Sequence, residues 1–264
     1  MRTLPTGQFI PGSSLLHKLD ARIKIISFII LIAAVIGASS ILGYSLVLVT
    51  VSSIILLSQL PISYALGSIR KIWLFFLVIF MMNGLFNNSG GTLVAWWIFH
   101  ISIGGIKQGF SVVINVILII ILGNLLTLTT SPTQVTSALE SLIKPLKLVG
   151  IPIEDIAMII SVSIQFIPTL MEETETIKMA QITRGARFES KKLSERARSY
   201  IPLIIPIFIS AFRRADELSL AMEARGYRNA KNRTKKKKKP IEGQDYIALT
   251  ICASICIVQF ILLR

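Results

Sequence analysis

The sequence is poor in charged residues and in cysteine. Of its 264 residues only 16% are charged, and two are cysteines. Soluble domains carry about 25% charged residues, so an ordinary soluble enzyme and a disordered regulator are both excluded. Two cysteines exclude a disulfide-stabilised scaffold. Cys252 and Cys256 lie one helical turn apart in an apolar run, where they cannot bridge each other without distortion, and we expect them to pack.

The sequence also lacks the common motifs of catalysis and ligand binding. It contains no G-x-x-x-x-G-K-[ST] phosphate loop, no H-E-x-x-H, no nucleophile elbow and no Cys/His cluster. We therefore predict no catalytic residues, no metal site, no bound cofactor and no enzymatic activity for this chain.

Long apolar runs dominate instead, because 53% of the residues are hydrophobic. A membrane-spanning helix needs about 20 largely apolar residues. Five runs meet this need approximately, and we expect spans at 25–42, 44–60, 72–86, 109–128 and 246–263. Two shorter apolar stretches, 156–170 and 201–212, contain prolines and are interpreted as buried or membrane-skimming helices. The predicted fold is an all-α polytopic membrane protein with about five spans.

The charge that is present is strongly basic and unevenly placed. Lys and Arg number 28 against 14 Asp and Glu, for a net charge of +14. Lys and Arg precede the first run, are absent from the loop 87–106, and lie mostly in 131–240. The positive-inside rule then places the N-terminus and 131–240 in the cytoplasm. We expect three regions: 1–130 with four spans, 131–240 as a cytoplasmic helical module, and 241–264 as the last span.

The module is predicted to hold amphipathic helices. Ser131 followed by Pro132 is a typical helix start, and Glu154 and Asp155 favour the start of a long second helix. A third helix is expected from about Ser194, continuing through two prolines.

The second and third helices are predicted to end alike, with an arginine followed by a glycine. The pairs are Arg184-Gly185 and Arg225-Gly226, the latter preceded by Glu223 and Ala224. Glycine adopts the left-handed conformation that closes a helix, and arginine complements the negative helix end. A guanidinium also binds a carboxylate through two parallel hydrogen bonds, so each end is a candidate docking point for an acidic pocket on a partner.

These paired ends, the four-plus-one span layout and the segment containing Asp20, Arg22 and Lys24 resemble the transmembrane T component (EcfT/CbiQ-like) of energy-coupling factor (ECF) transporters. The N-terminal segment is similar to the family's Leu-Asp-Pro-Arg-x-Lys motif, with Ala21 in place of proline. The first Arg-Gly motif has Thr183 where the family commonly has alanine.

The resemblance implies a non-catalytic coupling subunit of an ABC-type importer for vitamins or other micronutrients in a bacterial cell membrane. Two cytoplasmic ATPases, which bind the ATP, would hold Arg184 and Arg225, with Gly185 and Gly226 allowing their close approach. A small membrane S component would select the substrate and rest on the apolar faces of the same helices.

The run Lys235, Lys236, Lys237, Lys238 and Lys239 is predicted to anchor the chain to anionic lipid. It lies just before the last span, where each basic residue contributes about 1 kcal/mol of attraction to the membrane surface. No recognition fold or aromatic platform accompanies it, so we expect no nucleic acid partner.

Two other functions stay open at this point. A self-sufficient secondary transporter or channel would account for the number of apolar runs, although the five spans lack central ionisable residues. A membrane-embedded enzyme could use the carboxylate pairs Glu172-Glu173 or Asp216-Glu217, whose ordinary role is solvation of a helix surface.

Overall fold

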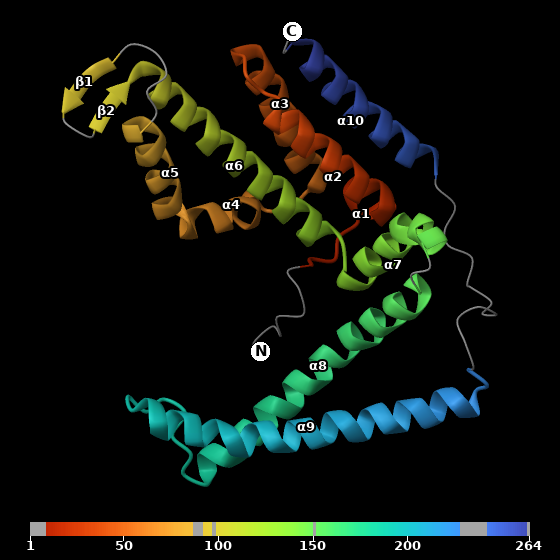
Figure 1. Ribbon diagram of the computed structural model, residues 1–264. Coiled ribbons are helices and arrows are strands. Elements are labelled where there is room, and N and C mark those ends of the chain that lie inside the picture. Colours follow the sequence, from red (N-terminus) through yellow and green to blue (C-terminus); the bar gives the residue numbers. More distant parts are fainter. Residues whose placement is uncertain (1–8, 87–91, 97–98, 150–151, 228–241, 263–264) are drawn as a thin grey trace. The chain divides into compact units, whose positions relative to one another are not determined.

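The structure is a computed structural model that describes residues 9–86, 92–96, 99–149, 152–227 and 242–262. Apart from one β-hairpin, the regular structure of these residues is helical (Figure 1), which confirms the all-α class. Contacts divide the chain into two units. The core unit comprises Gly7–Ala138 and Lys239–Arg264, and the long-helix unit comprises Met1–Thr6 and Leu139–Lys238.

The core unit is a bundle of apolar helices. Its long members are α2 (Ala21–Ile36), α3 (Ile41–Ser58), α5 (Trp73–Phe86), α6 (Ile103–Thr129) and α10 (Gly243–Leu262), accompanied by the short helices α1 (Leu15–Lys18) and α4 (Ile62–Lys71). A buried cluster from α2, α3, α6 and the residue Leu60 after α3 forms its interior: Leu31, Val35, Val47, Val51, Leu60, Leu118, Ile121, Leu122, Leu125 and Leu128. Among the described residues, helix α6 contributes half of this cluster and is therefore its central element.

The apolar run 25–42 is not one span, contrary to the sequence prediction. Helix α2 ends at Ile36, and a new helix begins at Ile41 after Ser40, whose side chain accepts a hydrogen bond from the Gly43 backbone N–H at 3.1 Å. The residues between the two helices are small or apolar, so hydropathy alone does not reveal the break. The cap at Ser40 does reveal it.

The segment between α5 and α6 also differs from the expected loop. Strands β1 (Thr92–Trp96) and β2 (Phe99–Ser102) pair antiparallel, with Ala95 opposite His100. Ser102 then caps α6, because its hydroxyl accepts from the Gly105 N–H at 2.9 Å. The hairpin thus leads directly into the first turn of the central helix.

Four described helices are long and apolar enough to cross a membrane: Ile41–Ser58, Ile103–Thr129, Asp155–Thr183 and Gly243–Ile261. The helix Trp73–Phe86 is apolar but shorter. These results agree with a polytopic membrane protein. The stretch 156–170 lies within one helix that continues through Pro168 to Thr183, as the predicted end at Arg184-Gly185 requires.

The region 131–240 begins as the sequence predicts. Helix α7 (Pro132–Ile143) starts with a capping box, in which the Ser131 hydroxyl accepts from the Gln134 N–H at 3.3 Å and the Gln134 side-chain oxygen accepts from the Ser131 N–H at 3.1 Å. The helix is followed directly by a 3₁₀ segment, η1 (Lys144–Val149), which contains Pro145.

The long-helix unit is built on two helices of similar length. Helix α8 spans Ile153–Thr183, and α9 spans Leu193–Ala224 and passes through Pro202 and Pro206. Arg214 pairs with Glu173 at 3.1 Å, and the Arg187 N–H donates to the Ser199 hydroxyl at 3.0 Å. Glu173 lies on α8 and Arg187 in the connection after it, and their partners Arg214 and Ser199 follow in reverse order along α9, so α8 and α9 form an antiparallel hairpin.

Candidate functional site

The end of α8 is a complete Schellman motif. Gly185 has φ +88°, its N–H donates to the Ile182 carbonyl at 3.0 Å, and the Ala186 N–H donates to the Gln181 carbonyl at 2.9 Å. This bonding pattern satisfies two of the carbonyl groups that a helix end leaves free, and it needs a residue that tolerates positive φ. Arg184 consequently occupies the C-cap position, with φ −84° and ψ 6°.

The end of α9 repeats this geometry. Gly226 has φ +73°, its N–H donates to the Glu223 carbonyl at 2.8 Å, and the Tyr227 N–H donates to the Met222 carbonyl at 2.9 Å. Arg225 is again the C-cap residue, with φ −82° and ψ 6°. The two arginines therefore leave their helices from equivalent backbone positions, so the repeat seen in the sequence is also a repeat in three dimensions.

Both motifs are open to the surroundings. Arg184, Gly185, Arg225 and Gly226 are all exposed, as are Glu223 and Ala224. A Cβ atom added to either glycine would meet no other described atom within 4 Å. The glycines are thus needed here for their backbone conformation. Within the part of the chain that the structure describes, neither arginine side chain forms a salt bridge.

The connection that follows the first motif is fastened to α9. Phe188 is buried, with 6% of its surface exposed, and its ring meets that of Tyr200 edge-on at a centroid distance of 5.4 Å. The Lys178 ammonium lies 5.9 Å from the centre of the same ring. Together with the bond from Arg187 to Ser199, these contacts hold the α8 end against the first turns of α9. No pattern in the sequence predicts the contacts of Phe188, Tyr200 and Lys178.

The second motif lies far from the first. Helix α9 continues from Ser199, beside the first motif, to Arg225, which is a rise of about 39 Å at 1.5 Å per residue. A single acidic pocket cannot accommodate two side chains at that separation. The two motifs are therefore two separate exposed sites rather than one composite site.

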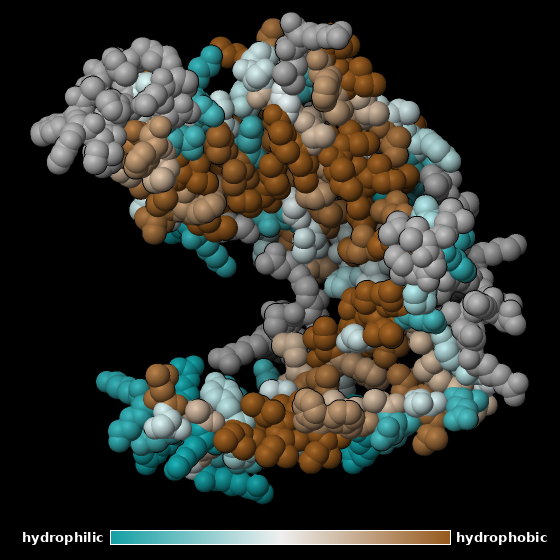
Figure 2. Space-filling model, in the orientation of Figure 1, coloured by the Kyte–Doolittle hydropathy of each residue, from teal (hydrophilic) through white to brown (hydrophobic). Residues whose placement is uncertain are grey.

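Apolar side chains lie exposed along the same two helices. Figure 2 shows hydrophobic surface on them, and the exposed residues include, on α8, Ile156, Ile159, Ile160 and Ile167, and, on α9, Ile201, Ile204, Ile205, Phe208, Ile209 and Phe212. The hairpin contact between α8 and α9 leaves this surface uncovered within its own unit. Such a surface needs lipid or a partner protein against it.

The N-terminal residues predicted from the sequence join three helix ends. Asp20 caps α2 by accepting from the Arg22 N–H at 2.8 Å and pairs with the Arg22 guanidinium at 3.4 Å. The Asp20 N–H donates to the Asp245 carboxylate of α10 at 2.9 Å. Lys24 donates to the Thr129 carbonyl at the end of α6, at 3.0 Å. Asp245 was not predicted, since its partner lies at the opposite end of the sequence.

The predicted lipid anchor, Lys235 to Lys239, lies outside the described residues. The remaining predicted residues lie in three places: one at each Arg-Gly motif and one at the N-terminal motif. The Arg-Gly motifs terminate the two long helices, and the N-terminal motif ties together α2, α6 and α10.

Comparison with known proteins now identifies the family. Residues 12–236 match the model of the family named CbiQ and described as "Cobalt transport protein". A protein from Brevibacillus brevis, named energy-coupling factor transporter transmembrane protein EcfT, is 40% identical over 98% of this chain and 97% of its own length. The chain belongs to the CbiQ/EcfT family.

Other EcfT proteins are similar over the same extent. The one from Bacillus subtilis is 35% identical over 97% of both chains, and that from Clostridium kluyveri is 37% identical over 100% of this chain and 98% of its own. The resemblance inferred from the sequence motifs is thereby confirmed. The chain is a multi-pass membrane protein of a bacterial transport family.

Proposed function

We propose that this CbiQ/EcfT chain is the non-catalytic coupling subunit of an energy-coupling factor importer. Two cytoplasmic ATPases bind the two Arg-Gly helix ends, one at each end. A separate small membrane protein, the S component, binds a vitamin or another micronutrient. The coupling subunit transmits the movement of the ATPases to that protein, and ATP is bound by the ATPases alone.

The observation that carries this proposal is the geometric equivalence of the two ends. Two exposed C-cap arginines, each followed by a glycine at positive φ, lie about 39 Å apart along α9. Helix termination alone would explain one such end. Two copies with the same exposed arginine fit two copies of one kind of partner, each with an acidic pocket that forms bidentate hydrogen bonds to a guanidinium.

The contacts of the core unit support a cytoplasmic N-terminus. The start of α2, the end of α6 and the start of α10 meet through Lys24 and Asp20, so they lie on one side of the membrane. Basic residues concentrate near these ends, as the positive-inside rule requires of the cytoplasmic side. In this arrangement α7 begins in the cytoplasm, and Lys235 to Lys239 attract the anionic lipids of the inner leaflet.

The exposed apolar side chains of α8 and α9 supply the surface for the S component. They sit on the same helices that end in the docking arginines, so a displacement of a helix end is passed along a rigid rod to the apolar surface. This continuity is what a mechanical coupling element requires.

The proposal is tested by reversing the charge of each arginine. We expect Arg184→Glu or Arg225→Glu to weaken ATPase binding by about 2–5 kcal/mol, because a buried, hydrogen-bonded charge pair loses one partner. The double variant is expected to purify without ATPases and to give no ATP-driven uptake in proteoliposomes. Arg213→Glu, at an exposed arginine about midway along α9 between the two motifs, serves as the matched control and should assemble normally.

Full assembly and uptake by the double variant would overturn the proposal. Solute flux through liposomes that contain only this chain would instead favour a self-sufficient transporter. The two outcomes are distinguished by the need for ATPases in the assay.

A further inference from the structure

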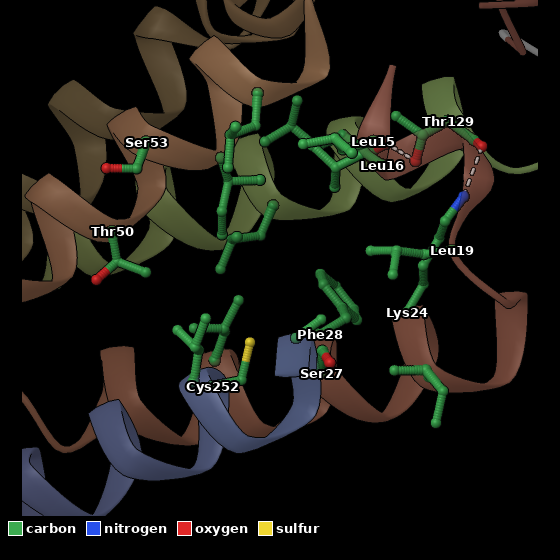
Figure 3. Close-up of a pocket in the computed structure, with 18 of the residues that line it drawn as sticks. Leu15, Leu16, Leu19, Lys24, Ser27, Phe28, Thr50, Ser53, Thr129 and Cys252 are labelled. Carbon is green, nitrogen blue, oxygen red and sulfur yellow. Dashed lines mark hydrogen bonds between the residues drawn. The ribbon is translucent and has the colours of Figure 1, made fainter. Parts of the chain in front are cut away.

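The core unit contains a cavity that the proposed coupling function does not use. It has a volume of about 510 Å³ and lies among α1, α2, α3, α6 and α10 (Figure 3). This volume falls in the range of about 300–1,000 Å³ typical of ligand pockets. Most of the lining is aliphatic or aromatic, and it includes Phe28, Leu31, Ile54 and Leu122.

The cavity opens sideways toward the bilayer. Its rim is formed by exposed side chains of α3 and α10, with Val49 63%, Leu57 51% and Ile251 53% exposed. Both helices are among those long and apolar enough to cross a membrane. An opening between two such helices meets hydrocarbon rather than water.

The shape of the cavity follows from how α3 and α10 approach each other. At one end they are in close contact, since a Cβ added to Gly43 would lie 2.5 Å from the Gln259 amide nitrogen. Toward the other ends of the two helices, at Leu57 and Gln244, the cavity fills the space between them. The two helices are thus in contact at Gly43 and diverge toward Leu57 and Gln244.

The Lys24 ammonium is the charged group in the lining of this cavity. The Lys24 ammonium and Thr129 lie at one end of the cavity, whereas Thr50 and Ser53 lie at the opposite end (Figure 3). Lys24 donates to the Thr129 carbonyl at 3.0 Å. An ammonium carries three N–H groups, and among the described residues this carbonyl is the one acceptor it reaches. The end at Lys24 can therefore still donate to an oxygen atom of a ligand.

We propose that this cavity binds one fatty acyl chain of a membrane phospholipid. The chain enters between α3 and α10, with its ester carbonyl toward Lys24 and its terminal methyl group toward Thr50. Hydrocarbon matches the aliphatic lining, and an empty cavity of this size would lose the dispersion contacts of its walls. Water would find few of the two to four polar partners that it needs.

The test uses photoactivatable phospholipid in nanodiscs of phosphatidylglycerol and phosphatidylethanolamine. The full chain is purified with its native partners, and a diazirine is placed either near the terminal methyl group or near the ester of the acyl chain. After irradiation, mass spectrometry locates the adducts. We expect the methyl-end probe to label Thr50 and Cys252, and the ester-end probe to label Leu19, which borders the cavity beside Lys24.

Filling the cavity provides the second arm of the test. Ser53→Phe adds a ring at the Thr50 end of the cavity, where Ser53 is part of the lining, and should abolish the methyl-end adducts while leaving the labels on the outer faces unchanged. Ser45→Phe, at an exposed position of the same helix outside the cavity, is the matched control and should keep them.

Three results would overturn the proposal. They are absence of cavity adducts in the wild-type chain, the same adducts from both probe positions, and cross-links in the cavity to a partner protein instead of lipid. The wild-type comparison of the two probes stands even if Ser53→Phe does not fold.

Discussion

The two units of this chain differ in how much of their apolar helix surface is buried. In the core unit a buried cluster of described residues joins α2, α3 and α6, and a third of the apolar window of α6 is buried. In the long-helix unit none of the corresponding window of α8 is buried inside the described chain. The core unit therefore carries its own stabilising contacts, whereas the described chain leaves the apolar surface of the long-helix unit uncovered.

The largest predicted effect is a difference in stability loss between a substitution in the core unit and one in the long-helix unit. Leu118→Ala in α6, where the leucine is buried, is expected to lower the free energy of unfolding by about 2–5 kcal/mol, because it leaves a cavity. Ile159→Ala in α8, at an exposed position, is expected to change it by about 0.5 kcal/mol or less. Unfolding in mixed detergent micelles measures both. Equal losses would show that α8 is packed as tightly as α6, against the comparison.

The second prediction concerns the docking ends. Gly226→Val forces a β-branched residue to φ +73°, which costs about 1–2 kcal/mol. Unwinding of the helix end should displace Arg225 and weaken ATPase binding by a factor of about 5–30. Gly226→Asn is the matched variant, because asparagine tolerates the left-handed region and should retain most of the affinity. If both variants bind equally well, the glycine conformation is irrelevant to docking.

The smallest expected effect is that of the salt bridge in the hairpin. Arg214 and Glu173, both partly exposed, are 3.1 Å apart, and a double-mutant cycle with Arg214→Met and Glu173→Gln should give a coupling energy of about 0.2–1 kcal/mol. A coupling well above this range would mean that the α8–α9 contact is a rigid core of its own.

Local signals predicted the helix boundaries within 131–240 well. Ser131-Pro132, the start near Ser194 and both Arg-Gly ends are confirmed as helix boundaries because caps act through neighbouring backbone groups. In the core unit, hydropathy did not predict the boundary between α2 and α3. It merged α2 with the start of α3, because small and apolar residues form the break after Gly37.

Contacts between residues far apart in the chain could not be predicted from the sequence patterns. The Asp20–Asp245 and Lys24–Thr129 bonds join residues more than a hundred positions apart, and the cavity lining comes from five helices. Single-sequence periodicity describes one helix at a time and carries no information on such pairings. The Arg-Gly motifs were found because each is complete within a few neighbouring residues.

The central claim is that each Arg-Gly end contacts one ATPase. A photo-cross-linking amino acid placed at Thr183 or at Ala224, the equivalent last residues of α8 and α9, tests it in the assembled complex. We predict that each position captures one ATPase subunit, and that the same probe at Ser163, an exposed position of α8, captures none. Absence of ATPase from the cross-links at both Thr183 and Ala224 would contradict the account.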